Sequence, residues 1–140
     1  MAVPTKLLLE IVTPDQSLVS EEVDEVQLPG ADGYLGVLPG HAALLSTLHV
    51  GELWYRVGQE KHFLAIASGF GEVLPDSVVV LAQIAERAED IDVARAEAAG
   101  KRAEERLAKG IVDIDLERAR VALLKSLIRV QVASRARTRV

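Results

Sequence analysis

Few side chains in this sequence have the types and spacing that catalysis or metal binding requires. There is no cysteine, which excludes disulfides, thiolate metal sites and thiol nucleophiles. The three histidines, His41, His49 and His62, do not follow a metal-ligand spacing, so structural roles are favoured for them. No nucleophile elbow, His-Glu-x-x-His pattern or P-loop occurs. Without an acid, a base and a nucleophile in one pattern, the sequence does not indicate an enzyme in its own right.

One pattern carries groups that could bind a ligand. The run Ile91-Asp92-Val93-Ala94-Arg95-Ala96 places a carboxylate and a guanidinium three residues apart, on one face of a predicted helix. An alternative needs no ligand, because an acid at a helix N-terminus is favoured by the helix dipole and can pair with the arginine. A second copy, Ile114-Asp115-Leu116-Glu117-Arg118-Ala119, indicates that the pattern can simply begin a helix.

These residues belong to the second of two parts with different compositions. All five prolines and all five aromatic residues precede residue 87. Residues 1–86 hold three basic and twelve acidic residues, a net charge of −9, whereas residues 87–140 hold thirteen basic and nine acidic ones, a net charge of +4. The formal charge of −5 therefore combines two opposed parts, and the abrupt change predicts two domains, 1–86 and 87–140.

The first domain is predicted to be an antiparallel β-sandwich or barrel. Short apolar or alternating stretches favour strands, and Pro-Gly, Asp-Gly and Pro-Asp pairs between them are typical of turns. We expect strands at 7–13, 23–28, 52–57, 62–67, 71–74 and 77–84. No stretch has helix-length periodicity, which argues against a parallel α/β sheet.

The second domain is predicted to be a hairpin of two antiparallel helices. The first should run from about 91 to 109, with Asp90 as its N-cap and Gly110 at its end, and the second should follow Asp113 and reach about residue 134. An apolar stripe in the second helix (Leu116, Ala119, Leu123, Leu127 and Val130) would face alanines of the first (Ala94, Ala98, Ala99 and Ala103) and Leu107. Because alanine buries little area, we expect stable helices with weak mutual packing.

Four motifs in order resemble the epsilon subunits of bacterial F-type ATP synthases. They are Val12-Thr13-Pro14-Asp15, the run from Gly33 to Ala42 (GYLGVLPGHA), Ser68-Gly69-Phe70-Gly71-Glu72-Val73, and the run from Ala85 to Asp92 (AERAEDID). The resemblance covers essentially the whole chain. It implies a sandwich of about ten strands followed by two helices, in a non-catalytic rotor subunit that couples proton or sodium translocation to ATP synthesis.

The resemblance also implies partners. The sandwich would bind the gamma subunit and the c-ring, with rotor contact at Val37, Leu38, His41 and Ala42. A packed turn is a strong alternative for these four residues, and contact and packing are favoured equally for His41. The helices would either fold against the sandwich or extend and inhibit ATP hydrolysis. In the extended state they would meet the alpha and beta subunits, and Arg118, Arg120, Lys125 and Arg129 would face an acidic beta surface. The chain would then be a peripheral protein on the cytoplasmic face of the bacterial cell membrane.

Some members of that family bind ATP on the folded hairpin through an Ile/Leu-Asp-x-x-Arg-Ala motif. Position by position, the resemblance assigns Glu86 and Asp92 to the adenine and ribose end of ATP. The phosphate end would fall to Arg95, Arg102, Arg129 and Lys125, the last standing where ATP-binding relatives have arginine. Lysine keeps the charge without the fork. Regulatory ATP is thus the one expected ligand, and no required cofactor is expected.

Two other classes of function compete with this interpretation. A stand-alone nucleotide-sensing module would use the same helix residues. A nucleic-acid binder would use the tail arginines Arg135, Arg137 and Arg139. The acidic first domain and the absence of aromatic residues near that tail argue against nucleic acid.

Overall fold

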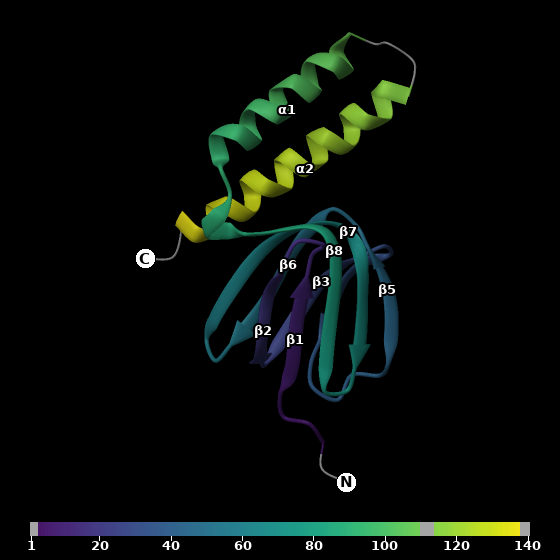
Figure 1. Cartoon of the computed structure of the whole chain (residues 1–140), viewed down its shortest axis with the longest axis vertical. Helices are drawn as coiled ribbons and strands as arrows, with labels where there is room; N and C mark the ends of the chain where they lie inside the picture. The colour runs from purple at the N-terminus through teal and green to yellow at the C-terminus, as the bar shows by residue number, and fades with distance from the viewer. Residues whose placement is uncertain (1–2, 110–113, 138–140) are drawn as a thin grey trace. The chain divides into compact units, whose positions relative to one another are not determined.

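The computed structural model describes residues 3–109 and 114–137, and the chain divides into two compact units, Met1–Glu86 and Arg87–Val140. The first unit is built of strands and the second of helices (Figure 1). The predicted combination of a β-sandwich and a two-helix hairpin is confirmed. None of the described helices is both long enough and apolar enough to cross a membrane.

Eight strands form the first unit. They are β1 (Leu7–Val12), β2 (Ser17–Val23), β3 (Glu25–Gly30), β4 (Gly33–Val37), β5 (Leu44–Leu48), β6 (Gly51–Val57), β7 (Glu60–Leu74) and β8 (Ser77–Arg87). Hydrogen bonding gives the order β2-β1-β8-β7-β5-β3-β4, and β6 pairs with β3 and β7. The pairs are antiparallel except that β1 runs parallel to β8, which differs from the fully antiparallel sandwich predicted.

One long strand accounts for part of the difference between the eight strands observed and the expected number of about ten. The first half of β7 pairs with β6 from Glu60 to Ile66, and its second half pairs with β5 from Gly69 to Val73. The pair Ser68-Gly69, where we predicted a break, is the point at which one strand changes partner. Ser68 has a φ of 49°, and a Cβ on Gly69 would lie 2.1 Å from the Leu81 carbonyl oxygen. The bend therefore needs a residue without a side chain at position 69.

The sandwich core consists of large apolar side chains. Its fully buried members are contributed by alternate positions of the strands, as in Leu7, Leu9 and Ile11 of β1. Three strands, β2, β4 and β5, were not among the predicted strands. Each has several exposed residues and thus lacks the clear alternation that marks β1.

The second unit contains a short 3-10 helix, η1 (Ala88–Asp90), and the helices α1 (Val93–Ala108) and α2 (Ile114–Arg137). The predicted cap was wrong, because Asp90 lies within η1 and Asp92 is the N-cap of α1. The Asp92 carboxylate accepts a hydrogen bond of 3.0 Å from the Arg95 backbone N–H. The predicted helix end at Gly110 and the cap at Asp113 lie outside the described residues.

Most of the buried residues of the two helices have small side chains. In α1 the buried residues are Ala96, Gly100 and Ala103, whereas Ala94 and Ala98, predicted to face α2, are exposed. In α2, Ala119 and Ser126 are buried seven residues apart, and Leu127 is 56% exposed. A Cβ on Gly100 would lie 2.5 Å from the Ser126 Oγ, so these two faces touch. We call this set of five buried residues the small-residue seam.

Candidate functional site

The loop between β4 and β5 presents three of the four predicted rotor-contact residues. Leu38 is 54% exposed, Ala42 is exposed and His41 is half-buried. Val37 is different, because it closes β4 with no exposed surface and packs in the core. Val37 therefore supports the loop from inside and is not accessible to a partner in this conformation.

Backbone hydrogen bonds hold this loop in one conformation. The Gly40 N–H donates to the Pro75 carbonyl at 2.7 Å, and the His41 N–H donates to the Leu38 carbonyl at 3.1 Å. Gly40 has a φ of 89°, in the left-handed region that favours glycine. The His41 Nδ1 lies 2.7 Å from the Ala42 carbonyl oxygen. The loop thus offers a fixed, partly apolar surface beside the turn between β7 and β8.

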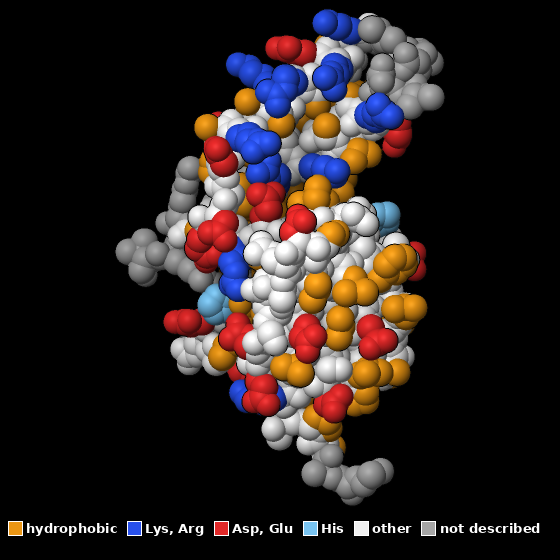
Figure 2. All heavy atoms as spheres, viewed as in Figure 1, with side chains coloured by type: hydrophobic (Ala, Val, Ile, Leu, Met, Phe, Trp, Pro, Cys, Tyr) orange, Lys and Arg blue, Asp and Glu red, His pale blue; other side chains and the backbone are white. Residues whose placement is uncertain are grey.

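Beside this loop, the outer face of the sheet is unusually apolar. Large side chains that point away from the core are exposed on four neighbouring strands: Leu8 of β1, Leu45 of β5, Phe70 and Leu74 of β7, and Leu81 of β8. Figure 2 shows hydrophobic side chains gathered on the sandwich, with acidic side chains among them. We call these five residues the apolar outer face. Exposed Glu72 lies between Phe70 and Leu74 on this face, and exposed apolar side chains grouped in this way mark interaction sites.

The apolar outer face was missed by the sequence analysis, although β8 carried a signal. The run from Val78 to Leu81 is apolar at every position, and a strand covered on both faces has this pattern. In the structure Val78 and Val80 are buried in the core, whereas Leu81 is 54% exposed. The uninterrupted run therefore predicted an apolar side chain on the outer face of β8.

At another part of the sandwich, a group of charged side chains joins three segments. The Asp24 carboxylate accepts from the Lys6 ammonium at 2.5 Å and from the Gly58 N–H at 2.7 Å. Arg56 donates to Glu25 at 3.1 Å and to the Gly58 carbonyl at 2.8 Å. The hydrogen bond from Lys6, followed by that from Gly58, holds the pKa of Asp24 below its ordinary value.

The predicted nucleotide residues are divided between the two units. Glu86 lies in β8 in the first unit, and the other five lie in the second. Arg95 and Arg102 are exposed and, being seven residues apart, share a face of α1. Lys125 and Arg129 are half-buried, four residues apart on α2. The Asp92 carboxylate caps α1 through the Arg95 backbone N–H, which fits the alternative that needs no ligand.

The basic residues expected to meet an acidic partner lie along α2. Arg118 and Arg120 are exposed, and Arg120 forms a 3.9 Å ion pair with Glu117. Arg118 and Lys125 line a shallow hollow together with Glu117, Val121 and Ala122. Figure 2 shows Lys and Arg side chains gathered on the visible face of the helical unit. Such an array can attract carboxylates or phosphates.

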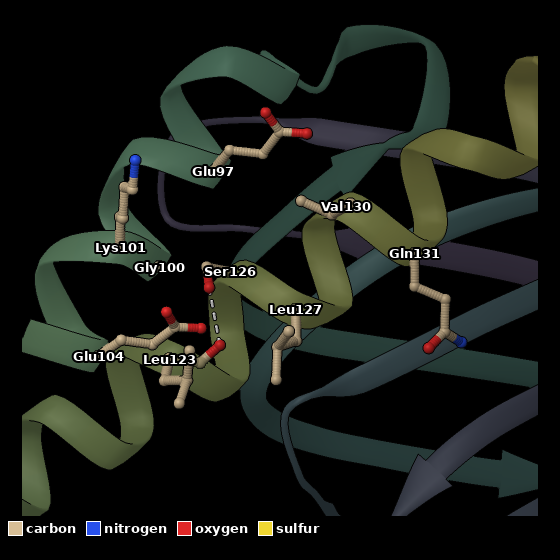
Figure 3. Close-up of a pocket in the computed structure, with 9 residues that line it drawn as sticks. All are labelled: Glu97, Gly100, Lys101, Glu104, Leu123, Ser126, Leu127, Val130 and Gln131. Carbon is tan, nitrogen blue, oxygen red and sulfur yellow. Dashed lines mark hydrogen bonds between the residues drawn. The ribbon is translucent and has the colours of Figure 1, made fainter. Parts of the chain in front are cut away.

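A groove of about 380 Å³ runs between α1 and α2. Glu97, Lys101 and Glu104 line its α1 side, and Leu123, Leu127 and Val130 line its α2 side (Figure 3). Gly100 and Ser126 lie where the two helices meet, and the Ser126 Oγ donates to the Leu123 carbonyl at 2.8 Å. None of the predicted nucleotide residues lines this groove.

Comparison with known proteins gives the same division of the chain. Residues 6–88 match the family model described as the beta-sandwich domain of the ATP synthase delta/epsilon chain. Residues 89–134 match the model described as the long alpha-helix domain of the same chain.

Relatives and solved structures agree with these matches. The chain is 50% identical over 130 residues to the ATP synthase epsilon chain of Syntrophobacter fumaroxidans, covering 93% of this chain and 97% of that protein. It is 46% identical over 132 residues to that of Solibacter usitatus, covering 94% and 98%. A chain in the cryo-EM structure of Euglena gracilis mitochondrial ATP synthase (OSCP/F1/c-ring) shares the fold, with a TM-score of 0.80, 23% identity, and 98% and 84% coverage. With both family models matched in order and close relatives aligned over nearly its whole length, the chain belongs to the ATP synthase delta/epsilon chain family.

Proposed function

We propose that this chain is the non-catalytic epsilon subunit in the central stalk of a bacterial F-type ATP synthase, which couples proton or sodium translocation to ATP synthesis. The observation that carries the proposal is the match of both family domains, in order, to the two units of the structure. A rotor part transmits torque and needs a rigid body, which the sandwich supplies. The chain would reach the cytoplasmic face of the cell membrane only through the complex.

The apolar outer face is the surface proposed for the stalk partner. Exposed leucines and Phe70 over four adjoining strands would be covered by an apolar surface of the gamma subunit. Glu72 lies on this face beside Leu45, so the partner should carry basic residues at the rim. The neighbouring loop with Leu38, His41 and Ala42 would meet the c-ring.

The hairpin is proposed to regulate the motor. An extended hairpin would place Arg118, Arg120, Lys125 and Arg129 against acidic surfaces of the beta subunits, with the alpha subunits adjoining, and so restrain ATP hydrolysis. Leu124 and Leu127 of α2 are 46% and 56% exposed, so part of the apolar surface of the hairpin is uncovered. This supports the proposal, because a switch needs two arrangements of similar free energy.

The test compares the complex carrying the full chain with the complex carrying residues 1–86. We expect the truncated chain still to co-purify with the membrane ATPase and ATP hydrolysis to rise. Equal hydrolysis by both complexes would contradict the regulatory role.

A second test addresses assembly through the apolar outer face. Leu81→Glu should abolish co-purification of the chain with the complex, because it places a charge on that face. The control Gln59→Glu, in the exposed turn between β6 and β7, should assemble normally. Normal assembly of both variants would contradict the proposed surface.

Regulatory ATP on the hairpin is the second candidate function. The observation that favours it is the exposure of Arg95 and Arg102 on one face of α1, with the basic array of α2 in the same unit. We expect calorimetry at millimolar ATP to give a binding heat that Arg102→Ala removes. The control Lys101→Ala, which changes a groove residue, should retain it. No heat with the unaltered chain would remove this candidate.

A further inference from the structure

The closest approach of the two helices rests on one residue pair. Gly100 of α1 and Ser126 of α2 are both buried. A Cβ built on Gly100 would lie 2.5 Å from the Ser126 Oγ and 3.2 Å from its Cβ. The Ser126 hydroxyl can rotate away from such a Cβ, but the Ser126 Cβ is fixed to the backbone of α2. A distance of 3.2 Å between the two Cβ atoms is shorter than the optimum of about 3.5–4.0 Å for two carbons. A side chain at position 100 therefore requires the Ser126 side chain, or the helix that carries it, to move by a few tenths of an ångström.

Gly100 is otherwise an unfavourable choice for this position. It lies near the middle of α1, a helix of 16 residues whose other members are mostly strong helix formers. Glycine is the poorest helix former except proline, so Gly100 weakens the helix it belongs to. Its position opposite Ser126 supplies a physical reason for it, which is the close pairing of α1 with α2.

The apolar side chains on this side of the hairpin are only partly covered. The groove beside the contact is open, and Leu127 on its wall is 56% exposed. Leu124, one residue beyond Leu123, is 46% exposed. Leu123 and Val130, which line the same groove, are half-buried, so they add apolar contact beside the small-residue seam.

We propose that the Gly100–Ser126 contact sets the equilibrium between the paired and the separated hairpin, and so tunes the regulation proposed above. Two effects of Gly100→Ala have opposite signs. The added methyl stabilises α1 as an isolated helix, and it disrupts the seam. We expect the loss of pairing at the seam to outweigh the gain in helix stability. A substitution that strengthens α1 by itself should therefore open the hairpin.

The experiment measures the hairpin directly in the full chain. The absence of cysteine allows a spin-label pair at Glu97→Cys and Gln131→Cys, two groove-lining positions on opposite helices. Electron–electron distance distributions then report the paired and separated populations. We expect Gly100→Ala to raise the separated-to-paired ratio by about fivefold or more, the usual range for overpacking. Circular dichroism should show that helix content is retained.

Two further variants keep the proposal falsifiable. Gly100→Ala with Ser126→Gly moves the missing side chain to the other helix and should return the distances toward those of the unaltered chain. Ala98→Gly makes the reverse change at an exposed position and should leave the pairing intact, although it weakens α1. An unchanged or narrower distribution for Gly100→Ala, or no recovery in the double variant, would overturn the proposal.

The proposal rests on the proposed function only for its consequence in the complex. There, Gly100→Ala should lower ATP hydrolysis, and the double variant should restore it. If the distances respond and hydrolysis does not, the seam controls the hairpin and the regulatory function fails. If the distances do not respond, the inference about the seam fails whatever hydrolysis does.

Discussion

The interior of each of the two units is built from a different kind of side chain. In the sandwich, large residues such as Leu9, Leu53 and Tyr55 have almost no exposed surface, and strands from both ends of the unit meet around them. In the hairpin, most of the buried residues are alanine, glycine or serine, while Leu124 and Leu127 of α2 are exposed. Burying a large apolar side chain adds more to the free energy of unfolding than burying a small one, because more apolar area leaves water. The first unit is thus built to stay folded, and the second is built to change its pairing.

The largest effect should come from a core substitution. Leu53→Ala in β6 removes a fully buried side chain and should lower the free energy of unfolding of the sandwich by about 2–5 kcal/mol. Trp54, the one tryptophan, lies next to it and reports urea unfolding of this unit by fluorescence. The matched change Leu127→Ala, at an exposed position of α2, should shift stability by less than about 0.5 kcal/mol. Equal losses would break the contrast between the units.

A glycine of the sandwich should be nearly as sensitive. A methyl at Gly69 would meet the Leu81 carbonyl oxygen, so Gly69→Ala should cost about 1–3 kcal/mol or more in the same fluorescence assay. Gly36 has open space around the corresponding position, and Gly36→Ala is the control. A stable Gly69→Ala protein would mean that β7 can change partner without a residue lacking a side chain.

A smaller, local effect should follow loss of the α1 cap. Asp92→Ala removes the acceptor for the Arg95 N–H and should weaken the start of α1 by about 1 kcal/mol. Amide exchange in the first turn of α1 measures it. Asp90→Ala, within η1, should change this exchange much less. A larger effect of Asp90→Ala than of Asp92→Ala would mean that Asp90 is the N-cap, as the sequence predicted.

The smallest effect concerns the charged group around Asp24. Because its folded pKa is lowered, Asp24 contributes stability above its unfolded pKa of about 3.9, and this contribution disappears as the pH falls through the folded value. Asp24→Asn should therefore be less stable than the unaltered chain at pH 7, and the difference should shrink below about pH 4. Urea unfolding at several pH values tests this. A difference that grows in acid would contradict it.

The sequence predicted the architecture better than it predicted the contacts. The abrupt change after Glu86 and the apolar strands carried the division into a sandwich and a hairpin. The sequence could not show that β7 is one strand with two partners, because residues distant in the sequence decide which strands pair. Helical spacing predicted Ala103 and Ala119 at the contact between the helices, but it did not single out Ala96, Gly100 and Ser126. A leucine stripe and an alanine stripe repeat with the same helical period, so the period alone does not show which stripe faces the other helix. Where two helices approach closely, only small side chains fit between them.

The candidate surfaces divide in a similar way. The loop residues Leu38, His41 and Ala42 were named from a resemblance, and the structure places all three with accessible surface. Val37 was named with them, yet it belongs to the core, because alternation along β4 turns it inward. The apolar outer face was missed because it exists only once four strands are brought together. ATP binding remains a prediction.

The most direct measurement of the central claim is native-state amide exchange across the full chain. We predict that amides of β1, β6 and β8 exchange only through global unfolding of the sandwich, whereas amides along the α1–α2 contact exchange through a lower-energy opening. The protection of α1 and α2 should also fall further in Gly100→Ala while that of the sandwich stays the same. Hairpin amides as protected as the sandwich core, and insensitive to position 100, would contradict the view that this chain joins a rigid unit to a switchable one.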